Sequence, residues 1–405
     1  MQTTPKSLRL QIAIFGRANV GKSSFLNLIS GQDAAITSPV PGTTTDVVEK
    51  PMELRPVGPV LLLDTAGLDD PGELGALRVA RTRKVFDRAD VAVLVTTAGV
   101  WGEAEENILA EAKKREIPVI IAVNQTDREA PSPEFLDQLR ALAPEVIELV
   151  CAPGADREAA LAVFKPALWR VLPESFVAPP PLLGDLVKPH SLVLMIVPVD
   201  LQAPKGRLIL PQVQAIRDVL DHDAMCLAVK ENEYPDLIGT LRPAPELVIC
   251  DSQVVDLMVR HTPPEIPCTT FSILFARMKG DLAAFLAGSR AIAGLRDGDR
   301  VLIAEACTHH ATCEDIGRVK IPRLLQAKTG KKLEFTFAPG RDFPAELADF
   351  RLIVHCGSCM LNRKETLWRI RMAQAANVPI VNYGMAISYC RGVLDRVTAI
   401  FRDRK

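Results

Sequence analysis

The sequence lacks a strong charge of either sign. Its 405 residues carry 48 lysines and arginines against 49 aspartates and glutamates, a formal net charge of −1. A chain so close to neutral has no overall attraction for a polyanion such as RNA or for an anionic lipid surface. Nor does it show an obvious surface of basic and aromatic residues for RNA. We therefore expect neither nucleic acid nor membrane among its partners.

Long apolar runs and an even cysteine count are also missing. No stretch approaches the ~18 uncharged apolar residues of a membrane span. The first residues, MQTTPKSLRLQ, lack the apolar region of a signal peptide. We therefore expect a cytoplasmic protein. In that compartment an odd count of nine cysteines argues for thiols, metal ligands or packing, and against a disulfide framework.

The chain alternates strand-like and helix-like segments from end to end. In the first part the apolar runs are LRLQIAIFG, PVLLLDTAG, ADVAVLVTT, IPVIIAVNQ and EVIELVCA. This alternation is typical of an α/β domain with a largely parallel sheet. The proline-rich string VAPPP, residues 177–181, indicates a stiff linker. We predict a first domain over residues 1–174.

Two further α/β domains are predicted after this linker. Residues 182–262 contain SLVLMIVPVD, AMCLAVK and ELVICDS. A domain this small is expected to bury surface against a second copy or a neighbouring domain. The string HTPPEIP marks the next boundary, and the third domain covers residues 266–405. Its predicted strands, in a parallel sheet, are TFSILFA, RVLIAEA, KLEFTFA, FRLIVHC and VPIVNYG.

A phosphate-binding motif follows the first strand. GRANVGKS matches G-x-x-x-x-G-K-[ST] between an apolar strand and the helix-like SFLNLIS. Its glycines let backbone N–H groups surround the phosphates, Lys22 adds positive charge, and the Ser23 hydroxyl can bind Mg²⁺. Together with the two motifs described next, this loop predicts a Ras-like P-loop GTPase domain. The nucleotide-binding residues expected from this loop are Gly16, Asn19, Val20, Gly21, Lys22, Ser23 and Ser24.

The string DTAG, residues 64–67, follows the second strand-like run. It would bring the Asp64 carboxylate to the magnesium ion and the Gly67 N–H to the γ-phosphate. Leu68 stands where Ras-like switches carry a glutamine that orients water. We therefore expect slow hydrolysis of GTP unless another group positions the attacking water.

A base-recognition motif, NQTD, follows a later strand-like run. Asn124 and Asp127 occupy the conserved positions of the N-K-x-D pattern of GTPases. The Asp127 carboxylate can accept hydrogen bonds that guanine offers and adenine does not, which selects GTP. Gln125 replaces the usual lysine, so weaker nucleotide binding is expected. Cys151 and Ala152, at the end of the fifth run, are added to the nucleotide-binding set, although Cys151 also reads as a packing residue.

This first third resembles the TrmE-Era branch of GTPases. The resemblance rests on Asn19 within GRANVGKSSFLN, on PGTTTD at residues 41–46, and on Leu68. It implies that Asn19 helps hold K⁺ beside the phosphates and that Thr44 is a magnesium ligand, although Thr45 stands where much of the branch has arginine. A potassium ion there would stabilise the charge of the transferring phosphoryl group. The catalytic residues so implied are Lys22, Thr44, Asp64 and Gly67.

Soft metal ligands gather in the last third of the chain. Cys307 and His309 are followed, after a gap, by His355, Cys356 and Cys359 in the string HCGSC. Cysteine and histidine at this density indicate a metal or iron-sulfur centre. Cys307 follows RVLIAEA, and His355 with Cys356 follows FRLIV. In a parallel sheet both positions lie at the carboxyl edge, where ligands bind.

Three thiolates would leave a cubane cluster one ligand short of complete thiolate ligation. Candidates for the fourth position are His309, His355, Glu314 or an exogenous ligand. Zinc remains an open alternative, because three cysteines with one histidine form an ordinary zinc site. A C-x-x-x-C-x-x-C string does not occur, so a radical-SAM enzyme is not indicated.

As a whole, the chain resembles the HydF family of FeFe-hydrogenase maturation GTPases. The resemblance covers the GTPase, the small middle domain and the C-x-H…H-C-x-x-C set. It implies a homodimer formed through the middle domain, and a [4Fe-4S] cluster on Cys307, Cys356 and Cys359 with a labile fourth ligand. It also implies a GTP-hydrolysing scaffold that carries the di-iron subcluster. The implied partners are the radical-SAM maturases HydE and HydG and the immature hydrogenase.

An alternative reading comes from a different class of protein. A TrmE-Era-like GTPase whose accessory domain is stabilised by zinc could act in RNA modification or ribosome assembly. The near-neutral charge counts against this alternative.

Overall fold

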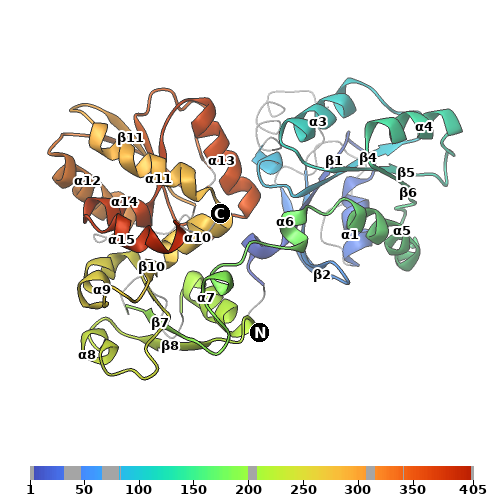
Figure 1. Ribbon diagram of the computed structural model, residues 1–405. Helices are drawn as coiled ribbons and strands as arrows, with labels where there is room; N and C mark the ends of the chain where they lie inside the picture. The colour runs from blue at the N-terminus through green and yellow to red at the C-terminus, as the bar shows by residue number, and fades with distance from the viewer. Residues whose placement is uncertain are drawn as a thin grey trace. The chain divides into compact units, whose positions relative to one another are not determined.

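The computed structural model describes residues 4–31, 47–65, 82, 84–198, 208–306, 315–340 and 342–402. The chain divides into two compact units, Met1–Pro179 and Pro180–Lys405. The division falls inside the proline-rich string at residues 177–181. Figure 1 shows the elements of each unit.

Unit 1 contains a six-stranded sheet in the order β2-β3-β1-β4-β5-β6. Its strands are β1 (Leu10–Phe15), β2 (Val48–Leu54), β3 (Gly58–Asp64), β4 (Val91–Thr97), β5 (Val119–Asn124) and β6 (Glu145–Glu148). All neighbours pair in parallel except β2, which runs antiparallel to β3. The predicted, largely parallel α/β fold is thus confirmed. The edge strand β2 was missed, because its VEKPMEL sequence has no apolar run.

Helices cover both faces of this sheet. They are α1 (Lys22–Ser30), α3 (Glu103–Lys114), α4 (Pro133–Leu142), α5 (Arg157–Arg170) and α6 (Glu174–Val177), with the 3-10 turn η1 (Lys6–Leu8) before β1. On one face Phe25 of α1 meets Phe164 of α5 edge to face, with 5.4 Å between ring centroids. On the other face, α3 and α4 contribute Ile108 and Leu139 to a second cluster of buried side chains.

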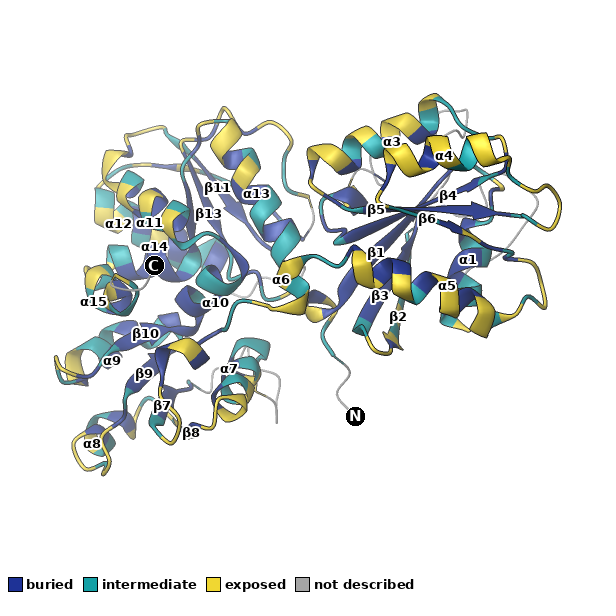
Figure 2. Cartoon of the chain, turned by 45° about the vertical axis from the view of Figure 1, so that its right-hand side comes forward, coloured by how far each residue is buried: buried dark blue, intermediate teal, exposed yellow. Residues whose placement is uncertain are grey.

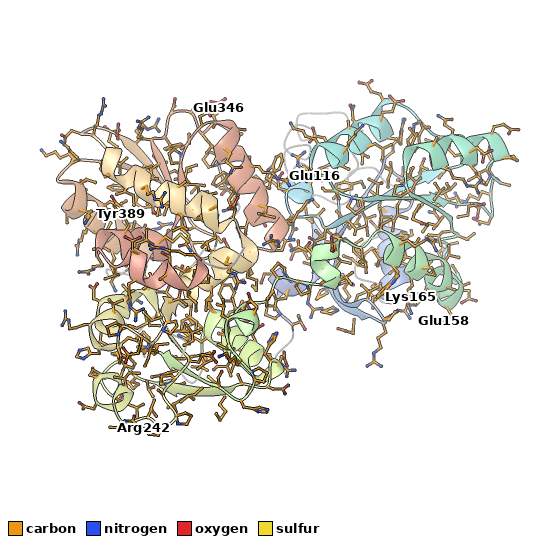
Figure 3. All side chains as sticks on the ribbon, in the orientation of Figure 1. Glu116, Glu158, Lys165, Arg242, Glu346 and Tyr389 are labelled. Atoms are coloured by element: carbon orange, nitrogen blue, oxygen red, sulfur yellow. The ribbon has the colours of Figure 1, made fainter. Side chains whose placement is uncertain are left out.

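The burial pattern follows this layering. In Figure 2 the central strands β1, β4 and β5 are buried, while the outer faces of the helices are exposed. Charged side chains such as Glu158 lie on the outer side of α5, away from the sheet (Figure 3). The hydrophobic effect therefore leaves the charged ends of these side chains in water. The loops that carry the motifs lie at the carboxyl edge of the sheet.

Unit 2 contains two four-stranded parallel sheets, in the orders β10-β9-β7-β8 and β12-β11-β13-β14. The strands are β7 (Leu192–Ile196), β8 (Met225–Val229), β9 (Leu247–Cys250), β10 (Cys268–Thr270), β11 (Arg300–Ala304), β12 (Glu334–Ala338), β13 (Leu352–His355) and β14 (Ile380–Asn382). One cluster of buried side chains includes Leu194 and Val248 from the first sheet, and Leu302 and Ile353 from the second. This shared core explains why residues 180–405 form one unit.

The helices of unit 2 connect and cover these strands. They are α7 (Leu210–Asp221), α8 (Tyr234–Ile238), α9 (Val255–His261), α10 (Phe271–Lys279), α11 (Leu282–Ala291), α12 (Ile321–Thr329), α13 (Arg363–Ala375), α14 (Tyr383–Cys390) and α15 (Leu394–Thr398), with the shorter turns η2 (Gly184–Leu186), η3 (Ser252–Val254), η4 (Ile292–Gly294), η5 (Ile316–Lys320) and η6 (Ala399–Phe401). None of the helices in the described part of the chain is long and apolar enough to cross a membrane.

The strand predicted over TFSILFA is wrong. Only Cys268–Thr270 is extended, as β10, and it pairs with β9 of the first sheet of this unit. The Thr270 hydroxyl then accepts a hydrogen bond from the Ile273 N–H at 3.2 Å and begins helix α10. Most of α10 is buried, and a short, nearly continuous apolar run does not distinguish a buried helix from a buried strand.

Candidate nucleotide and metal sites

The P-loop of unit 1 joins β1 to α1. Its backbone takes positive φ angles of 146° at Gly16, 62° at Asn19 and 97° at Gly21. A Cβ atom on Gly21 would lie 2.2 Å from Nδ2 of Asn124. Glycine is therefore required at this position, both for the backbone angle and for the close approach of the neighbouring loop.

The loop curls around the Lys22 side chain. Lys22 is buried, and its Nζ donates a hydrogen bond to the Arg17 carbonyl at 2.6 Å. Helix α1 begins at Lys22, and the N–H groups of its first turn and its dipole favour an anion. Ser24, in the same turn, is half-buried. An ammonium, a helix N-terminus and a glycine-rich loop at one point form a phosphate site.

Ser23 and Asp64 meet at the expected magnesium position. The Ser23 hydroxyl donates to Oδ2 of Asp64 at 2.6 Å, and Asp64 is fully buried at the end of β3. Its other oxygen, Oδ1, has no hydrogen-bond partner among the described residues. Burial raises the pKa of Asp64, against the hydrogen bond from Ser23 and the charge of Lys22. A buried carboxylate oxygen beside a hydroxyl suits Mg²⁺, so these residues fit the ion.

Asn124 ties three loops together. At the end of β5, its Nδ2 donates to the Val20 carbonyl and its Oδ1 accepts from the Cys151 N–H, both at 2.9 Å. Gln125 reinforces this contact by donating to the Asn19 carbonyl at 3.2 Å. The structure thus brings together predicted residues that lie far apart in the chain. Asp127 and Ala152 are exposed beside this junction in sequence.

One contact at the P-loop was missed by the sequence analysis. Arg17 forms two hydrogen bonds of 2.7 Å with Glu105, a fully buried residue of α3. Glu105 also accepts from the Gly102 N–H at 2.9 Å. This ion pair fixes the first turn of the P-loop to a helix that no motif marks. Only the tertiary structure reveals it.

Several predicted site residues lie outside the described part of the chain. These residues are Thr44, Gly67, Cys307, His309 and Glu314. Their assigned roles stay predictions.

The HCGSC string of unit 2 forms the loop between β13 and α13. Residues Ala304 of β11 and His355 of β13 pair in register, so these two strands end side by side. This confirms that the strand before Cys307 and the strand before Cys356 share one sheet edge. The Cys356 N–H donates to the Ala304 carbonyl at 2.9 Å, and its Sγ accepts from the Ala306 N–H at 3.1 Å. An N–H directed at sulfur stabilises a thiolate.

His355 is used by the loop itself. It is buried, its Nδ1 lies 2.9 Å from the Cys356 carbonyl, and its Nε2 lies 3.3 Å from Nη1 of Arg369. Burial and the Arg369 charge lower the pKa of His355 to about 3, so the ring is neutral. With Nδ1 donating to the carbonyl, Nε2 accepts from Arg369. Both ring nitrogens are engaged, which does not favour His355 as the fourth cluster ligand.

Two buried cations flank this loop, and no sequence motif marks either of them. Arg369 also donates to the Gly340 carbonyl at 2.9 Å. Lys279 of α10 donates to carbonyls of the loop. Burial lowers the pKa of Lys279 to about 8, while the thiols of Cys359 and Cys356 act to raise it. The ammonium form therefore predominates at neutral pH.

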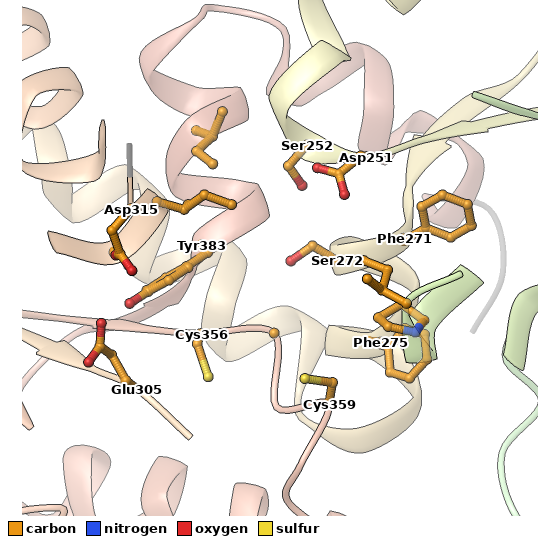
Figure 4. Close-up of a pocket in the computed structure, with 16 residues that line it drawn as sticks. Asp251, Ser252, Phe271, Ser272, Phe275, Glu305, Asp315, Cys356, Cys359 and Tyr383 are labelled. Carbon is orange, nitrogen blue, oxygen red and sulfur yellow. The ribbon is translucent and has the colours of Figure 1, made fainter. Parts of the chain in front are cut away.

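A cavity of about 250 Å³ adjoins the two thiols. Figure 4 shows Cys356 and Cys359 on one side and Ser252 with Asp251 on the other. Ser252 is buried, and its hydroxyl has no hydrogen-bond partner among the described residues. Burial raises the pKa of Cys359, against the charge of Lys279. Within the described residues no group of three or more metal-binding side chains is found; two of the three predicted thiols fall in this part.

Family models match three stretches of the chain. Residues 11–125 match the 50S ribosome-binding GTPase model. Residues 182–280 match the Hydrogen maturase F dimerization domain, and residues 283–400 match the Hydrogen maturase F tetramerization domain. The two maturase models together cover more than half of the chain.

Individual relatives resemble the GTPase region. The tRNA modification GTPase MnmE of Synechococcus sp. (strain JA-3-3Ab) is 47% identical over 150 residues, 36% of this chain and 30% of that protein. MnmE of Ligilactobacillus salivarius is 39% identical over 139 residues, 34% and 29% of the two chains. The match thus spans less than a third of these relatives. Era of Aquifex aeolicus bound to GDP·AlF4⁻ has 21% identity and a TM-score of 0.36, covering 58% of this chain and 98% of that one.

The parallel sheet, the P-loop and the Ser23–Asp64 pair define a protein with a P-loop GTPase domain. The region that follows it consists of two self-association domains named after one maturase. The chain belongs to the hydrogen maturase F (HydF) family.

Proposed function

We propose that this protein is a GTP-hydrolysing scaffold that binds a [4Fe-4S] cluster and carries the di-iron subcluster to immature FeFe-hydrogenase. One observation carries the proposal. The region matched by the two maturase models holds Cys356 and Cys359 at a sheet edge, with their sulfur atoms beside a cavity. A site of this kind offers both soft ligands and space for a ligand at the metal.

The nucleotide chemistry is assigned to unit 1. Lys22 would neutralise phosphate oxygens, Ser23 and Asp64 would hold Mg²⁺ together with Thr44, and Asp127 would select guanine. Asn19 would help hold K⁺, which supplies positive charge beside the transferring phosphoryl group. GTP turnover is therefore expected to be faster in potassium than in sodium buffer of equal ionic strength. Equal rates in the two buffers would refute the role of potassium.

The cluster chemistry is assigned to unit 2. Cys307, Cys356 and Cys359 would ligate three irons, and the Ala306 N–H would stabilise the Cys356 thiolate. Glu314, His309 or an exogenous ligand would occupy the fourth position, since Nε2 of His355 is engaged by Arg369. A bound cluster with one exchangeable ligand supplies an iron at which another group can dock.

The proposed partners follow from the family. They are a second copy of the chain, the radical-SAM maturases HydE and HydG, and the hydrogenase apoprotein, all in the cytoplasm. GTP hydrolysis would change the contacts made by the segments that carry Thr44 and Gly67, and so bias the exchange of these partners.

Transfer of the di-iron unit is the direct test. Full-length protein purified anaerobically with both radical-SAM maturases should activate hydrogenase apoprotein, whereas a Cys359→Ala variant prepared in the same way should not. If the variant activates as well as wild type, the cluster site is not part of the transfer.

A second candidate is a zinc-stabilised GTPase of RNA modification. The similarity of the first third of the chain to tRNA modification GTPases favours it. The maturase models over residues 182–280 and 283–400 favour the first function. Specific binding of tRNA by a zinc-containing preparation would decide for the second.

A further inference from the structure

A buried lysine side chain contacts the loop between β13 and α13 that carries Cys356 and Cys359, which we call the cysteine loop. Lys279, the last residue of α10, is 3% exposed. Its Nζ donates to the carbonyls of Ser358 at 3.1 Å, Cys359 at 3.3 Å and Leu361 at 2.9 Å. An ammonium has three N–H donors, so each donor is matched by one carbonyl of the loop.

The charge of Lys279 has no carboxylate partner within the described residues. Its further contact there is with the Phe275 ring, 5.6 Å from Nζ to the centroid. Burying an ammonium is unfavourable unless an anion or strong dipoles compensate its charge. Carbonyl dipoles meet part of that cost. The thiols of Cys356 and Cys359 interact electrostatically with the same ammonium, and as thiolates they would provide the missing negative charge.

The three carbonyl contacts also fix the shape of the loop. Ser358 has a φ angle of 57°, an unusual angle for a residue other than glycine. Its hydroxyl lies 3.3 Å from Nδ1 of His355, and its carbonyl is bound by Lys279. The hydrogen bonds from Lys279 thus hold the segment between Cys356 and α13. Lys279 lies near the end of the region matched by the dimerization model, residues 182–280. The cysteine loop lies in the region matched by the tetramerization model, residues 283–400.

We propose that Lys279 is a positioning and charge-compensating residue for the metal centre, an inference that rests on the proposed cluster. Its hydrogen bonds hold the loop that presents Cys356 and Cys359. Its positive charge favours the thiolate ligands and the more negative, reduced state of a bound cluster. It also joins the cysteine loop to α10, so that the two matched domains share one metal environment.

The test compares full-length variants reconstituted anaerobically with iron and sulfide. Lys279→Met removes the charge and the donors, Lys279→Gln keeps amide donors without the charge, and Lys279→Arg keeps the charge. Lys331→Met is the matched control, because Lys331 is 41% exposed and pairs with Asp297 at 3.4 Å in the same unit. The readouts are cluster loss to a chelator, the midpoint potential by redox titration, and GTP turnover.

We expect Lys279→Met to lose its cluster about tenfold faster than wild type, because removal of a residue that orients metal ligands typically weakens metal binding by about tenfold or more. Its midpoint potential should become more negative, because the reduced cluster loses a nearby positive charge. Lys279→Gln should shift the potential in the same direction, and Lys279→Arg should have a potential closer to that of wild type. Lys331→Met should change neither the potential nor the rate of cluster loss. GTP turnover should stay the same in all four.

Separate results overturn the two levels of the account. If wild type holds a cluster and Lys279→Met or Lys279→Gln keeps its potential and its rate of cluster loss, Lys279 has no such role. If Lys279→Met does not fold, the Lys279→Gln potential decides. A wild-type protein that takes up no iron refutes the proposed function itself, and the role of Lys279 with it.

Discussion

A single methyl group on Gly21 would clash with a neighbouring side chain at the phosphate-binding loop. Gly21 has a φ angle of 97°, and a Cβ there would lie 2.2 Å from Nδ2 of Asn124. Gly21→Ala should therefore weaken GDP and GTP binding at least about tenfold, since the backbone strain alone costs ~1–2 kcal/mol. Binding of a fluorescent guanine nucleotide measures the change.

The control for this variant is Gly58→Ala. Gly58 also has a positive φ, 105°, but a Cβ there has no neighbour within 4 Å. It should bind nucleotide like wild type. If both alanine variants bind normally, the close approach of Asn124 to the P-loop is not needed for binding.

Base selection is predicted to depend on one residue, Asp127. Asp127 is exposed after β5, and its carboxylate would accept two hydrogen bonds from guanine. Asp127→Asn should lower GTP affinity at least about a hundredfold, because two hydrogen bonds to a charged group are worth ~3 kcal/mol or more. The same variant should gain affinity for xanthosine triphosphate, whose carbonyl can accept from the amide. Titration with both nucleotides tests this, with Asp137→Asn as the exposed control. Unchanged GTP affinity would remove Asp127 from the site.

At the scale of the element, the edge strand β2 is fixed by charge as well as by pairing. Glu49 of β2 accepts hydrogen bonds from Lys6 at 2.6 Å and Arg88 at 2.7 Å. Burial raises the pKa of Glu49, but the hydrogen bonds and charges of Lys6 and Arg88 outweigh it and hold the pKa at about 2, against an ordinary 4.5. The folded state therefore binds this proton more weakly than the unfolded state does.

This lowered pKa makes the stability of unit 1 depend on pH. The contribution of Glu49 is complete above pH 4.5 and is lost as the pH falls toward 2. Its size is on the order of 2 kcal/mol, because solvent screens this partly exposed carboxylate and reduces the free energy that the full pKa shift would give. In urea unfolding followed by circular dichroism, Glu49→Gln should be less stable than wild type at neutral pH, and the difference should shrink on acidification. A difference independent of pH would show that Glu49 acts through packing.

At the scale of the whole molecule, the residues of the two proposed chemistries lie in different compact units. The P-loop belongs to Met1–Pro179, and the cysteine loop belongs to Pro180–Lys405. Lys22→Ala should therefore abolish nucleotide binding and keep the cluster. Cys356→Ala should abolish the cluster and leave GTP hydrolysis largely intact. Metal analysis and phosphate release, measured on both variants, would contradict this modular arrangement if either variant lost both properties.

The sequence predicts much of this molecule because its patterns are local. Strand runs, the P-loop and the HCGSC string each depend on neighbouring residues, and the parallel sheets place the strand ends together. Helix α10 escaped because an apolar run does not reveal its period. Edge strand β2 escaped because it is polar.

Long-range partners of the sites could not be predicted from such patterns. Glu105 lies 88 residues from Arg17, and Lys279 lies 80 residues from Cys359. Neither residue belongs to a motif. Burial of a charged side chain is a property of the folded chain and becomes visible only when the tertiary contacts are known.

The central claim is that unit 2 holds an iron-sulfur cluster, and metal analysis of the anaerobically purified full-length protein tests it most directly. Iron, acid-labile sulfide and zinc would be measured per chain, together with the visible and electron paramagnetic resonance spectra. The account predicts a brown protein with about four irons and four sulfides per chain and little zinc, as a [4Fe-4S] cluster requires. A colourless protein with about one zinc per chain would contradict it.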